Sequence, residues 1–194
     1  PPTIYRGRVI FGCADGWIYC LHASDGTLAW RFRAAPSETL CASYGQLESV
    51  WPVHGSVLVR DGTVYAVAGR SMFLDGGLRM LLLDAKTGRK SSENVMDNRH
   101  PRTGKSLQHE LTWPNLPTTL PDVLSSKGDK IYMRAQEFNL SGKRTDLKVS
   151  LGYGQQAGES THLFCPTGFL DDSWWHRSYW LHGKTYLGGA AGWW

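Results

Sequence analysis

The stretch that decides the fold of this chain is residues 9–32, which read VIFGCADGWIYCLHASDGTLAWRF. β-branched and aromatic residues gather there in three short runs separated by turn formers. We therefore predict strands at residues 9–13, 17–21 and 28–32. The Asp-Gly pairs between them are typical of tight turns, because glycine adopts the positive φ angles that such turns require.

The first Asp-Gly pair sets the expected register of the hairpin. If Asp15 and Gly16 are the central residues of a two-residue turn, Cys13 lies opposite Ile18. Side chains alternate between the two faces of a strand, so the residues of one face follow from this pairing. That face carries Val9, Phe11, Cys13, Ile18 and Cys20, with Phe11 opposite Cys20. The other face is also apolar, so we expect the sheet to be covered on both sides.

Parts of this stretch recur later in the chain. Residues 7–10 have a counterpart at 62–65, an offset of 55, and residues 21–26 have one at 83–88, an offset of 62. The additional residues of the second copy are expected in a loop at 70–77.

Two weaker copies begin at residues 127–132 and 182–186. Together the copies predict one repeat domain over residues 1–194. The chain begins without a methionine, and we expect it to be a piece truncated at both ends. The repeat copies are expected at about residues 1–33, 50–92, 122–145 and 163–194.

Composition supports an all-β chain and excludes some functions. Hydrophobic residues make up 41% of the 194 residues, and nine tryptophans and 22 glycines favour aromatic-rich strands with glycine turns. No apolar run reaches the length of about 18 residues that a membrane-spanning helix needs. The net charge of +4 is too small to predict a nucleic-acid partner. It arises in residues 86–105, which we interpret as a solvated insertion between strands.

The four cysteines, Cys13, Cys20, Cys41 and Cys165, do not have the spacing of a metal site. Cys13 and Cys20 are expected to be diagonal neighbours about 7–8 Å apart, which is too far for a disulfide. We expect thiols that pack as small hydrophobic side chains, and no bound metal.

The residues from Gly12 to Trp30 also carry a family resemblance. They fit Gly-x-x-Asp-Gly-x-x-Tyr-x-Leu-x-Ala-x-x-Gly-x-x-x-Trp, a pattern that resembles the pyrroloquinoline-quinone-type β-propeller repeat. This repeat occurs in quinoprotein alcohol dehydrogenases and in non-enzymatic bacterial propellers, including an outer-membrane assembly lipoprotein. The resemblance implies an all-β fold, an incomplete β-propeller of four-stranded antiparallel blades, each packed between two neighbours. It also implies a periplasmic or cell-envelope location.

Two stretches that lead into tryptophan-rich strands are candidate ligand sites. Residues 162–180 combine acids, a histidine that titrates near neutral pH, an arginine and aromatic rings that can stack on planar ligands. The candidates there are Asp171, Asp172, Trp174, His176 and Arg177. Residues 45–55 and the copy that follows add Trp51, His54 and Arg70 as possible partners. The alternative interpretation is structural, with the acids in a turn and the tryptophans packed between blades.

Two functions follow from these observations. The first is a binding or assembly scaffold that contacts a protein partner or a small ligand at the propeller face, without catalysis or a cofactor in this piece. The alternative is part of a dehydrogenase that uses pyrroloquinoline quinone and calcium at the mouth of the propeller channel. The resemblance implies an adjacent pair of cysteines in such enzymes, and this sequence has no such pair. The scaffold is therefore the preferred interpretation.

Overall fold

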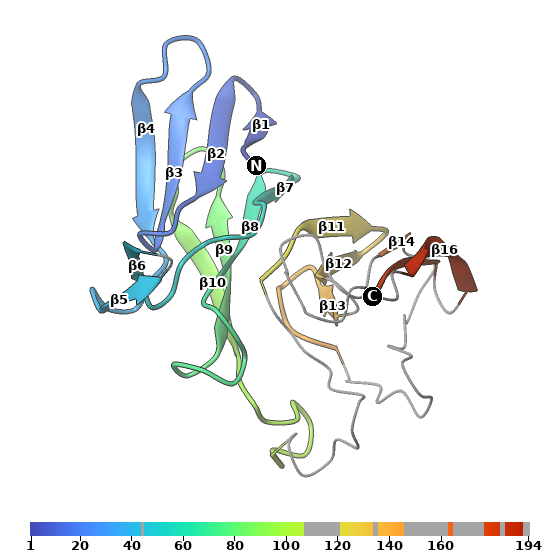
Figure 1. Cartoon of the computed structure of the whole chain (residues 1–194). Helices are drawn as coiled ribbons and strands as arrows, with labels where there is room; N and C mark the ends of the chain where they lie inside the picture. Colours follow the sequence, from blue (N-terminus) through green and yellow to red (C-terminus); the bar gives the residue numbers. More distant parts are fainter. Residues whose placement is uncertain are drawn as a thin grey trace.

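The computed structural model describes residues 1–43, 45–106, 121–133, 136–145, 163–164, 177–182 and 185–191, the last three as backbone strands. These residues form antiparallel sheets that follow one another along the chain (Figure 1). None of them belongs to a helix that could span a membrane. The predicted all-β fold is confirmed.

Two four-stranded sheets, which we call blade 1 and blade 2, form the first half of the chain. Blade 1 has the order β1 (Thr3–Tyr5), β2 (Arg8–Gly12), β3 (Trp17–His22) and β4 (Leu28–Arg33). Blade 2 contains β7 (Leu58–Arg60), β8 (Thr63–Ala68), β9 (Leu78–Asp84) and β10 (Lys90–Met96). Between the blades, β5 (Leu40–Ser43) and β6 (Gln46–Ser49) form a separate hairpin.

Two smaller sheets follow. Blade 3 contains β11 (Leu124–Lys127), β12 (Lys130–Met133) and β13 (Gln136–Asn139). The fourth sheet contains β14 (Leu163–Phe164), β15 (Arg177–His182) and β16 (Thr185–Ala191). The sheets form an open array among the described residues, which is the arrangement expected of an incomplete propeller (Figure 1).

The repeat offsets are confirmed by the pairing of strands. Val9 pairs with Leu21 in blade 1, and Val64 pairs with Leu83 in blade 2, so both the offset of 55 and the offset of 62 join equivalent positions. The loop between β8 and β9 covers residues 69–77 and holds the additional residues, as predicted.

The predicted register of the first hairpin is wrong by one residue. Ile10 pairs with Cys20, and Phe11 pairs with Tyr19 rather than with Cys20. Because a slip of one residue moves every side chain of a strand to the opposite face, Phe11 leaves the face that holds Ile18 and Cys20.

The reason is that the turn contains three residues, not two. The Cys13 backbone N–H donates to the Trp17 carbonyl at 3.0 Å, which closes a loop of Ala14, Asp15 and Gly16. Gly16 takes a φ of 84°, as expected for the last residue of such a loop. The Asp15 carboxylate accepts a bond from the Trp17 N–H at 2.9 Å and stabilises this longer turn.

One face of blade 1 packs against blade 2 to form the first core. Ile10, Ile18 and Cys20 are fully buried there against Val64 and Leu83 of blade 2. The first strands of the two blades are also joined, because the Thr3 hydroxyl donates to the Val57 carbonyl just before β7.

Trp30 connects the two blades at the outer strand of blade 1. Its indole Nε1–H donates to the Ala85 carbonyl of blade 2 at 3.1 Å. The ring lies so close to Gly88 that a Cβ there would be 2.7 Å from the indole, so only glycine leaves room for it. Gly88 also has a φ of 71°, which glycine adopts without strain.

Blade 2 packs against blade 3 through its other face. Tyr65, Met80 and Leu82 meet Ile131 and Phe138 in a second buried cluster. Blade 2 is thus covered on both sides. For the sheet of blade 1, which the sequence predicts to be covered on both sides, the described residues cover one face.

Two further predictions can be compared with the structure. Cys13, Cys20 and Cys41 are free thiols, as expected, whereas Cys165 lies outside the described residues. Burial raises the pKa of Cys20, so it remains a neutral thiol. Residues 86–105 are not simply a solvated insertion, because residues 90–96 form β10 and complete the sheet of blade 2.

Candidate functional site

The β5–β6 hairpin is the starting point of the candidate site. It stands at the end of blade 1, beside the turn that joins β2 to β3 (Figure 1). Cys41 lies opposite Glu48 in the hairpin, and Ala42 lies opposite Leu47. Because side chains alternate along a strand, Cys41, Ser43 and Glu48 share one side of the hairpin, the inner side. Leu40, Ala42 and Leu47 share the other, the outer side.

The hairpin is attached to the Asp-Gly turn of blade 1 through its backbone. The Ser49 N–H donates to the Ala14 carbonyl at 2.8 Å, and the Val53 N–H donates to the Cys13 carbonyl at 2.9 Å. A Cβ on Gly16 would be 2.7 Å from the Ser49 hydroxyl oxygen, so the hairpin approaches the turn only because residue 16 is glycine. The turn that decides the fold therefore also positions the site.

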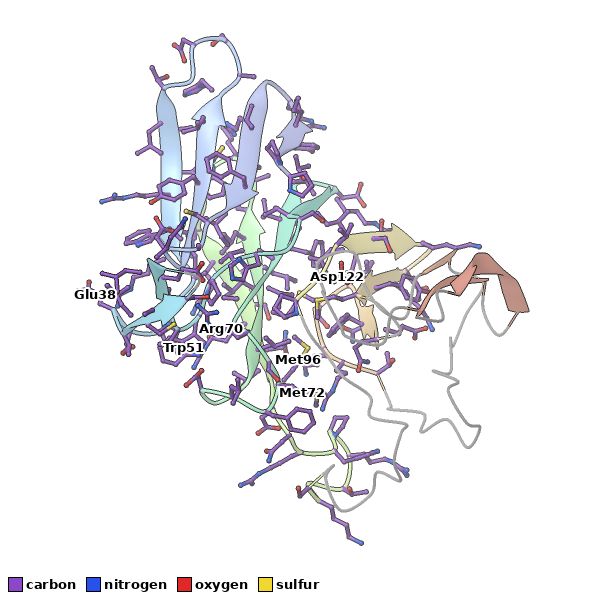
Figure 2. All side chains as sticks on the ribbon, in the orientation of Figure 1. Glu38, Trp51, Arg70, Met72, Met96 and Asp122 are labelled. Carbon is purple, nitrogen blue, oxygen red and sulfur yellow. The ribbon has the colours of Figure 1, made fainter. Side chains whose placement is uncertain are left out.

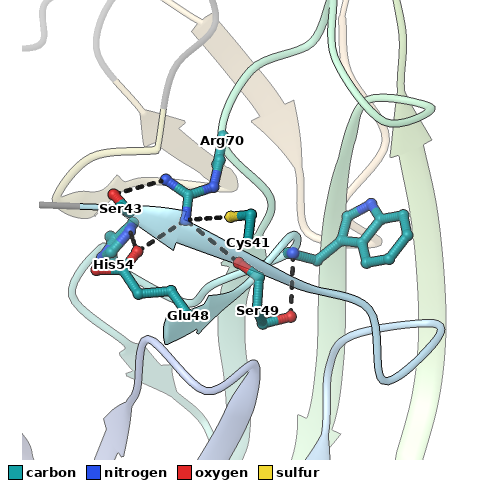
Figure 3. Close-up of polar contacts among 7 residues, drawn as sticks. Cys41, Ser43, Glu48, Ser49, His54 and Arg70 are labelled. Atoms are coloured by element: carbon teal, nitrogen blue, oxygen red, sulfur yellow. Dashed lines mark hydrogen bonds and ion pairs between the residues drawn. The ribbon is translucent and has the colours of Figure 1, made fainter. Parts of the chain in front are cut away.

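Arg70 holds the inner side of the hairpin from blade 2. It comes from the loop at residues 69–77, and its Nη2 donates to Glu48 Oε2 at 2.8 Å (Figure 3). The same nitrogen donates to Cys41 Sγ at 3.2 Å and to the Ser49 carbonyl at 3.4 Å. Nη1 lies 3.5 Å from the Ser43 hydroxyl. The guanidinium thus gathers the acceptors of both strands around one positive charge.

His54 is the second partner of the Glu48 carboxylate. Its Nε2 lies 3.6 Å from Glu48 Oε2 (Figure 3). Burial lowers the pKa of His54 and the charge of Arg70 lowers it further, whereas Glu48 raises it; the net shift is downward. The imidazole is therefore mainly neutral at pH 7, and Arg70 balances most of the charge of Glu48.

Trp51 connects the hairpin to the same loop of blade 2. Its indole Nε1–H donates to the Asp75 carbonyl at 2.9 Å, and its backbone N–H donates to the Ser49 hydroxyl at 3.1 Å. Figure 2 shows Trp51 and Arg70 at this end of the blades. The indole is thus occupied in fastening the loop, which agrees with the structural interpretation of this residue.

The structure places the side chains of three predicted site residues, Trp51, His54 and Arg70. Arg70 and His54 meet at one carboxylate, and the Trp51 indole donates to Asp75 on the loop that carries Arg70. Arg177 begins β15, but its side chain is not described. The positions that lie outside the described residues are Asp171, Asp172, Trp174 and His176.

Sequence reasoning missed Glu48 and Cys41. Both lie in or beside the stretch that holds Trp51 and His54, so a search for an acid to pair with Arg70 could have selected Glu48. Glu48 and Cys41 precede Arg70 by 22 and 29 residues in the sequence, so no local sequence pattern indicates these contacts.

The cluster of side chains around Arg70 is suited to holding the hairpin in place rather than to catalysis. Its acceptors converge on a guanidinium, which occupies the position where a bound cation would be held. In the part of the chain that the structure describes, no three His, Cys, Asp or Glu side chains are grouped so that they could hold a metal ion. On the outer side of the hairpin, in contrast, two leucines are open to solvent, with exposed fractions of 56% for Leu40 and 75% for Leu47, whereas Ser49 on the same side is buried against the turn of blade 1.

Comparison with known proteins gives matches among solved structures. No protein-family model and no curated protein matches the sequence. A europium-containing methanol dehydrogenase has a TM-score of 0.55 at 15% identity, over 98% of this chain and 41% of that one. The quinohemoprotein alcohol dehydrogenase ADHIIG from Pseudomonas putida HK5 has a TM-score of 0.47 at 20% identity, over 74% of this chain and 19% of that one. BamB from Moraxella catarrhalis has a TM-score of 0.34 at 18% identity, over 94% of this chain and 54% of that one.

Of these three, the methanol dehydrogenase alone has a TM-score above 0.5, and because its identity is low it bears on the fold alone. The chain also spans only about half or less of each of these proteins. The order of strands in the blades and the likeness to the methanol dehydrogenase agree with the repeat pattern of residues 12–30. The chain therefore has the fold of part of a β-propeller.

Proposed function

We propose that this chain is part of a propeller that serves as a binding or assembly scaffold, and that the β5–β6 hairpin makes its contact with a protein partner. The observation that carries the proposal is the two-sided character of the hairpin. Its inner side is fastened by Arg70, while Leu40 and Leu47 on its outer side face solvent. Exposed leucines on one side of an element that is held in a fixed position offer apolar surface to a partner.

The backbone of the hairpin supports the same proposal. The Val50 N–H donates to the Thr39 carbonyl at 3.0 Å, which makes these two a hydrogen-bonded pair. In an antiparallel ladder, hydrogen-bonded pairs alternate with pairs whose backbone N–H and C=O groups point away from the partner strand. Leu40 and Ala42 belong to pairs of the second kind, so their backbone groups point to the free edge of β5. Such an edge can accept an extended segment of another protein, with the leucines providing apolar contacts.

Site-specific crosslinking in the cells that produce the protein tests the proposal. A photoreactive amino acid placed at Leu47 is expected to capture one defined protein, and the Arg70→Ala variant is expected to weaken this capture because the hairpin loses its fastening. The matched control is the same amino acid at Val95, which is also exposed but lies on β10 of blade 2. Equal capture from both positions, or none from Leu47, would contradict the proposal.

The quinone-dependent dehydrogenase is tested separately. The described residues offer neither adjacent cysteines nor a group of acidic side chains that fits calcium. We therefore expect no saturable quenching of tryptophan fluorescence when pyrroloquinoline quinone and calcium are titrated into the protein. Quenching that saturates and is abolished by Asp171→Ala or Trp174→Ala would replace the scaffold with the enzyme.

A further inference from the structure

The turn that follows β13 in blade 3 carries an exposed asparagine. Asn139 is the last residue of β13, and it is exposed together with Leu140 and Ser141. Two backbone bonds close the turn: the Asn139 N–H donates to the Lys143 carbonyl at 3.0 Å, and the Gly142 N–H donates to the Asn139 carbonyl at 2.9 Å. Asn139 therefore belongs to a short, closed turn at the surface.

The amide oxygen of Asn139 also stabilises this turn. Oδ1 accepts hydrogen bonds from the Ser141 N–H at 3.1 Å, from the Ser141 hydroxyl at 2.8 Å and from the Lys143 N–H at 3.0 Å. The amide nitrogen, Nδ2, donates to none of the residues that the structure describes. The turn thus uses the Asn139 side chain only as an acceptor.

Blade 2 shows that an acceptor alone is sufficient in this turn. Asp84 is the last residue of β9, which is the third strand of its sheet as β13 is of blade 3. Its N–H donates to the Arg89 carbonyl at 2.9 Å, and its Oδ1 accepts the Thr87 N–H and the Thr87 hydroxyl, both at 2.7 Å. A carboxylate, which has no N–H to donate, therefore closes the equivalent turn. The nitrogen of Asn139 is not required for the structure of the turn.

The backbone of the turn after β13 is fixed on blade 2. The Tyr65 hydroxyl donates to the Leu140 carbonyl at 2.9 Å, and Asn94 Nδ2 donates to the Ser141 carbonyl at 2.9 Å. The turn is thus held in one position through its carbonyl groups, while the side chains of Asn139 and Ser141 remain at the surface.

The sequence of the turn indicates a use for the free nitrogen. Asn139, Leu140 and Ser141 form the pattern Asn-x-Ser, with x other than proline, at which asparagine is glycosylated in exported proteins. The other three asparagines have neither serine nor threonine two residues later; they are Asn94, Asn98 and Asn115. The pattern therefore coincides with the exposed amide whose nitrogen the turn does not use. It also agrees with the cell-envelope location that the family resemblance implies.

We propose that Asn139 is a glycosylation site, where a transferase attaches an oligosaccharide that is carried on a lipid diphosphate. Nδ2 forms a bond to the anomeric carbon of the first sugar and loses one proton. The bond from this carbon to the diphosphate oxygen breaks, and the lipid diphosphate leaves with the electron pair. Oδ1 keeps its hydrogen bonds to Ser141 and Lys143, because the sugar is attached to the nitrogen. The turn therefore remains closed, and the glycan extends into solvent.

Mass spectrometry of the protein isolated from the cells that produce it tests this proposal. Cleavage after lysine and arginine releases residues 135–143 as one peptide, which contains Asn139. We expect this peptide to carry the added mass of sugar residues, and fragment ions to assign that mass to Asn139. Residues 91–99, released in the same way, contain Asn94 and Asn98 and are the internal control, which is expected to be unmodified.

Three variants separate glycosylation from the structure of the turn. Asn139→Asp keeps the acceptor that Asp84 provides in blade 2, so it is expected to abolish the added mass without changing the midpoint of urea denaturation. Ser141→Ala is expected to abolish the added mass although Asn139 is present. Ser141→Thr is the matched control, because it restores a hydroxyl and is expected to retain the modification.

The proposal is wrong if the peptide of residues 135–143 carries no sugar in the protein from these cells. It is equally wrong if the added mass persists in Asn139→Asp or is unaffected by Ser141→Ala, since the nitrogen or the hydroxyl would then play no part. A lower urea midpoint for Asn139→Asp than for the unmodified parent chain would show that the nitrogen serves the fold, and would also overturn the argument.

Discussion

At the scale of single residues, Arg70 is the contact on which the position of the β5–β6 hairpin depends. Arg70→Ala leaves the Glu48 carboxylate, whose side chain is only 13% exposed, without its main partner. Hydrogen bonds to charged groups contribute about 1.5–3 kcal/mol, so we expect a loss of this order in the free energy of unfolding, measured by urea denaturation. Arg60→Ala is the matched control and should cost little, since its partner Asp61 is 90% exposed. Equal losses in the two variants would contradict the assignment.

The lowered pKa of His54 predicts how the free energy of unfolding depends on pH. Its folded-state pKa lies below the ordinary value of 6.5, mainly because of burial, so the unfolded chain binds the proton more tightly. The free energy of unfolding should therefore fall as the pH drops through 6.5 toward the folded-state pKa. His54→Gln should flatten this part of the profile, measured by thermal denaturation between about pH 8 and about pH 5.5. His22→Gln, at an exposed position, is the control, and an identical flattening there would refute the role of His54.

At the scale of elements, substitutions of two glycines in equivalent turns distinguish the cost of backbone strain from the cost of lost packing. Gly26 and Gly88 have nearly the same positive φ, 72° and 71°, but only Gly88 lies against the Trp30 indole. Gly26→Ala should cost about 1–2 kcal/mol from strain alone. Gly88→Ala should cost clearly more, because the added methyl group displaces the indole and weakens its bond to Ala85. Similar costs, measured by urea denaturation of both variants, would show that the indole contact is unimportant for stability.

The turns also show how far the sequence determines the elements. Hydrophobic runs and Asp-Gly pairs were sufficient to locate the strands of blade 1, and the two offsets located the long loop of blade 2. The register depended on whether the turn holds two or three residues, and an Asp-Gly pair is compatible with both. The three-residue length of the turn is fixed by the hydrogen bond from the Cys13 N–H to the Trp17 carbonyl and by the β5–β6 hairpin, which packs on the turn.

The candidate site was harder to predict than the fold for a physical reason. Trp51, His54 and Arg70 could be selected as residue types with useful chemistry, but Glu48 gains its role only when the loop of blade 2 reaches the hairpin of blade 1. Such a contact depends on how two blades pack, and no periodicity within either blade encodes it. The predicted group at residues 171–176 remains a prediction.

At the scale of the whole molecule, the open faces predict how the isolated chain behaves. Ile4 and Leu28 on blade 1 and Leu47 on the hairpin are largely exposed, and exposed apolar surface of this kind promotes association. We expect the chain to bind hydrophobic dyes and to self-associate, as measured by fluorescence and light scattering. Replacing Ile4 and Leu28 together by serine should reduce both signals. A monodisperse monomer that melts cooperatively and binds no dye would contradict this expectation.

The ion pair between Arg70 and Glu48 also bears on the order of events during synthesis. The arginine is translated 22 residues after the carboxylate that it holds, and it comes from the following blade. A nascent chain that has released only blade 1 therefore has the leucines of the hairpin but not the residue that orients them. If the hairpin contacts a partner as proposed above, that contact is expected only after the second blade has folded and supplied Arg70.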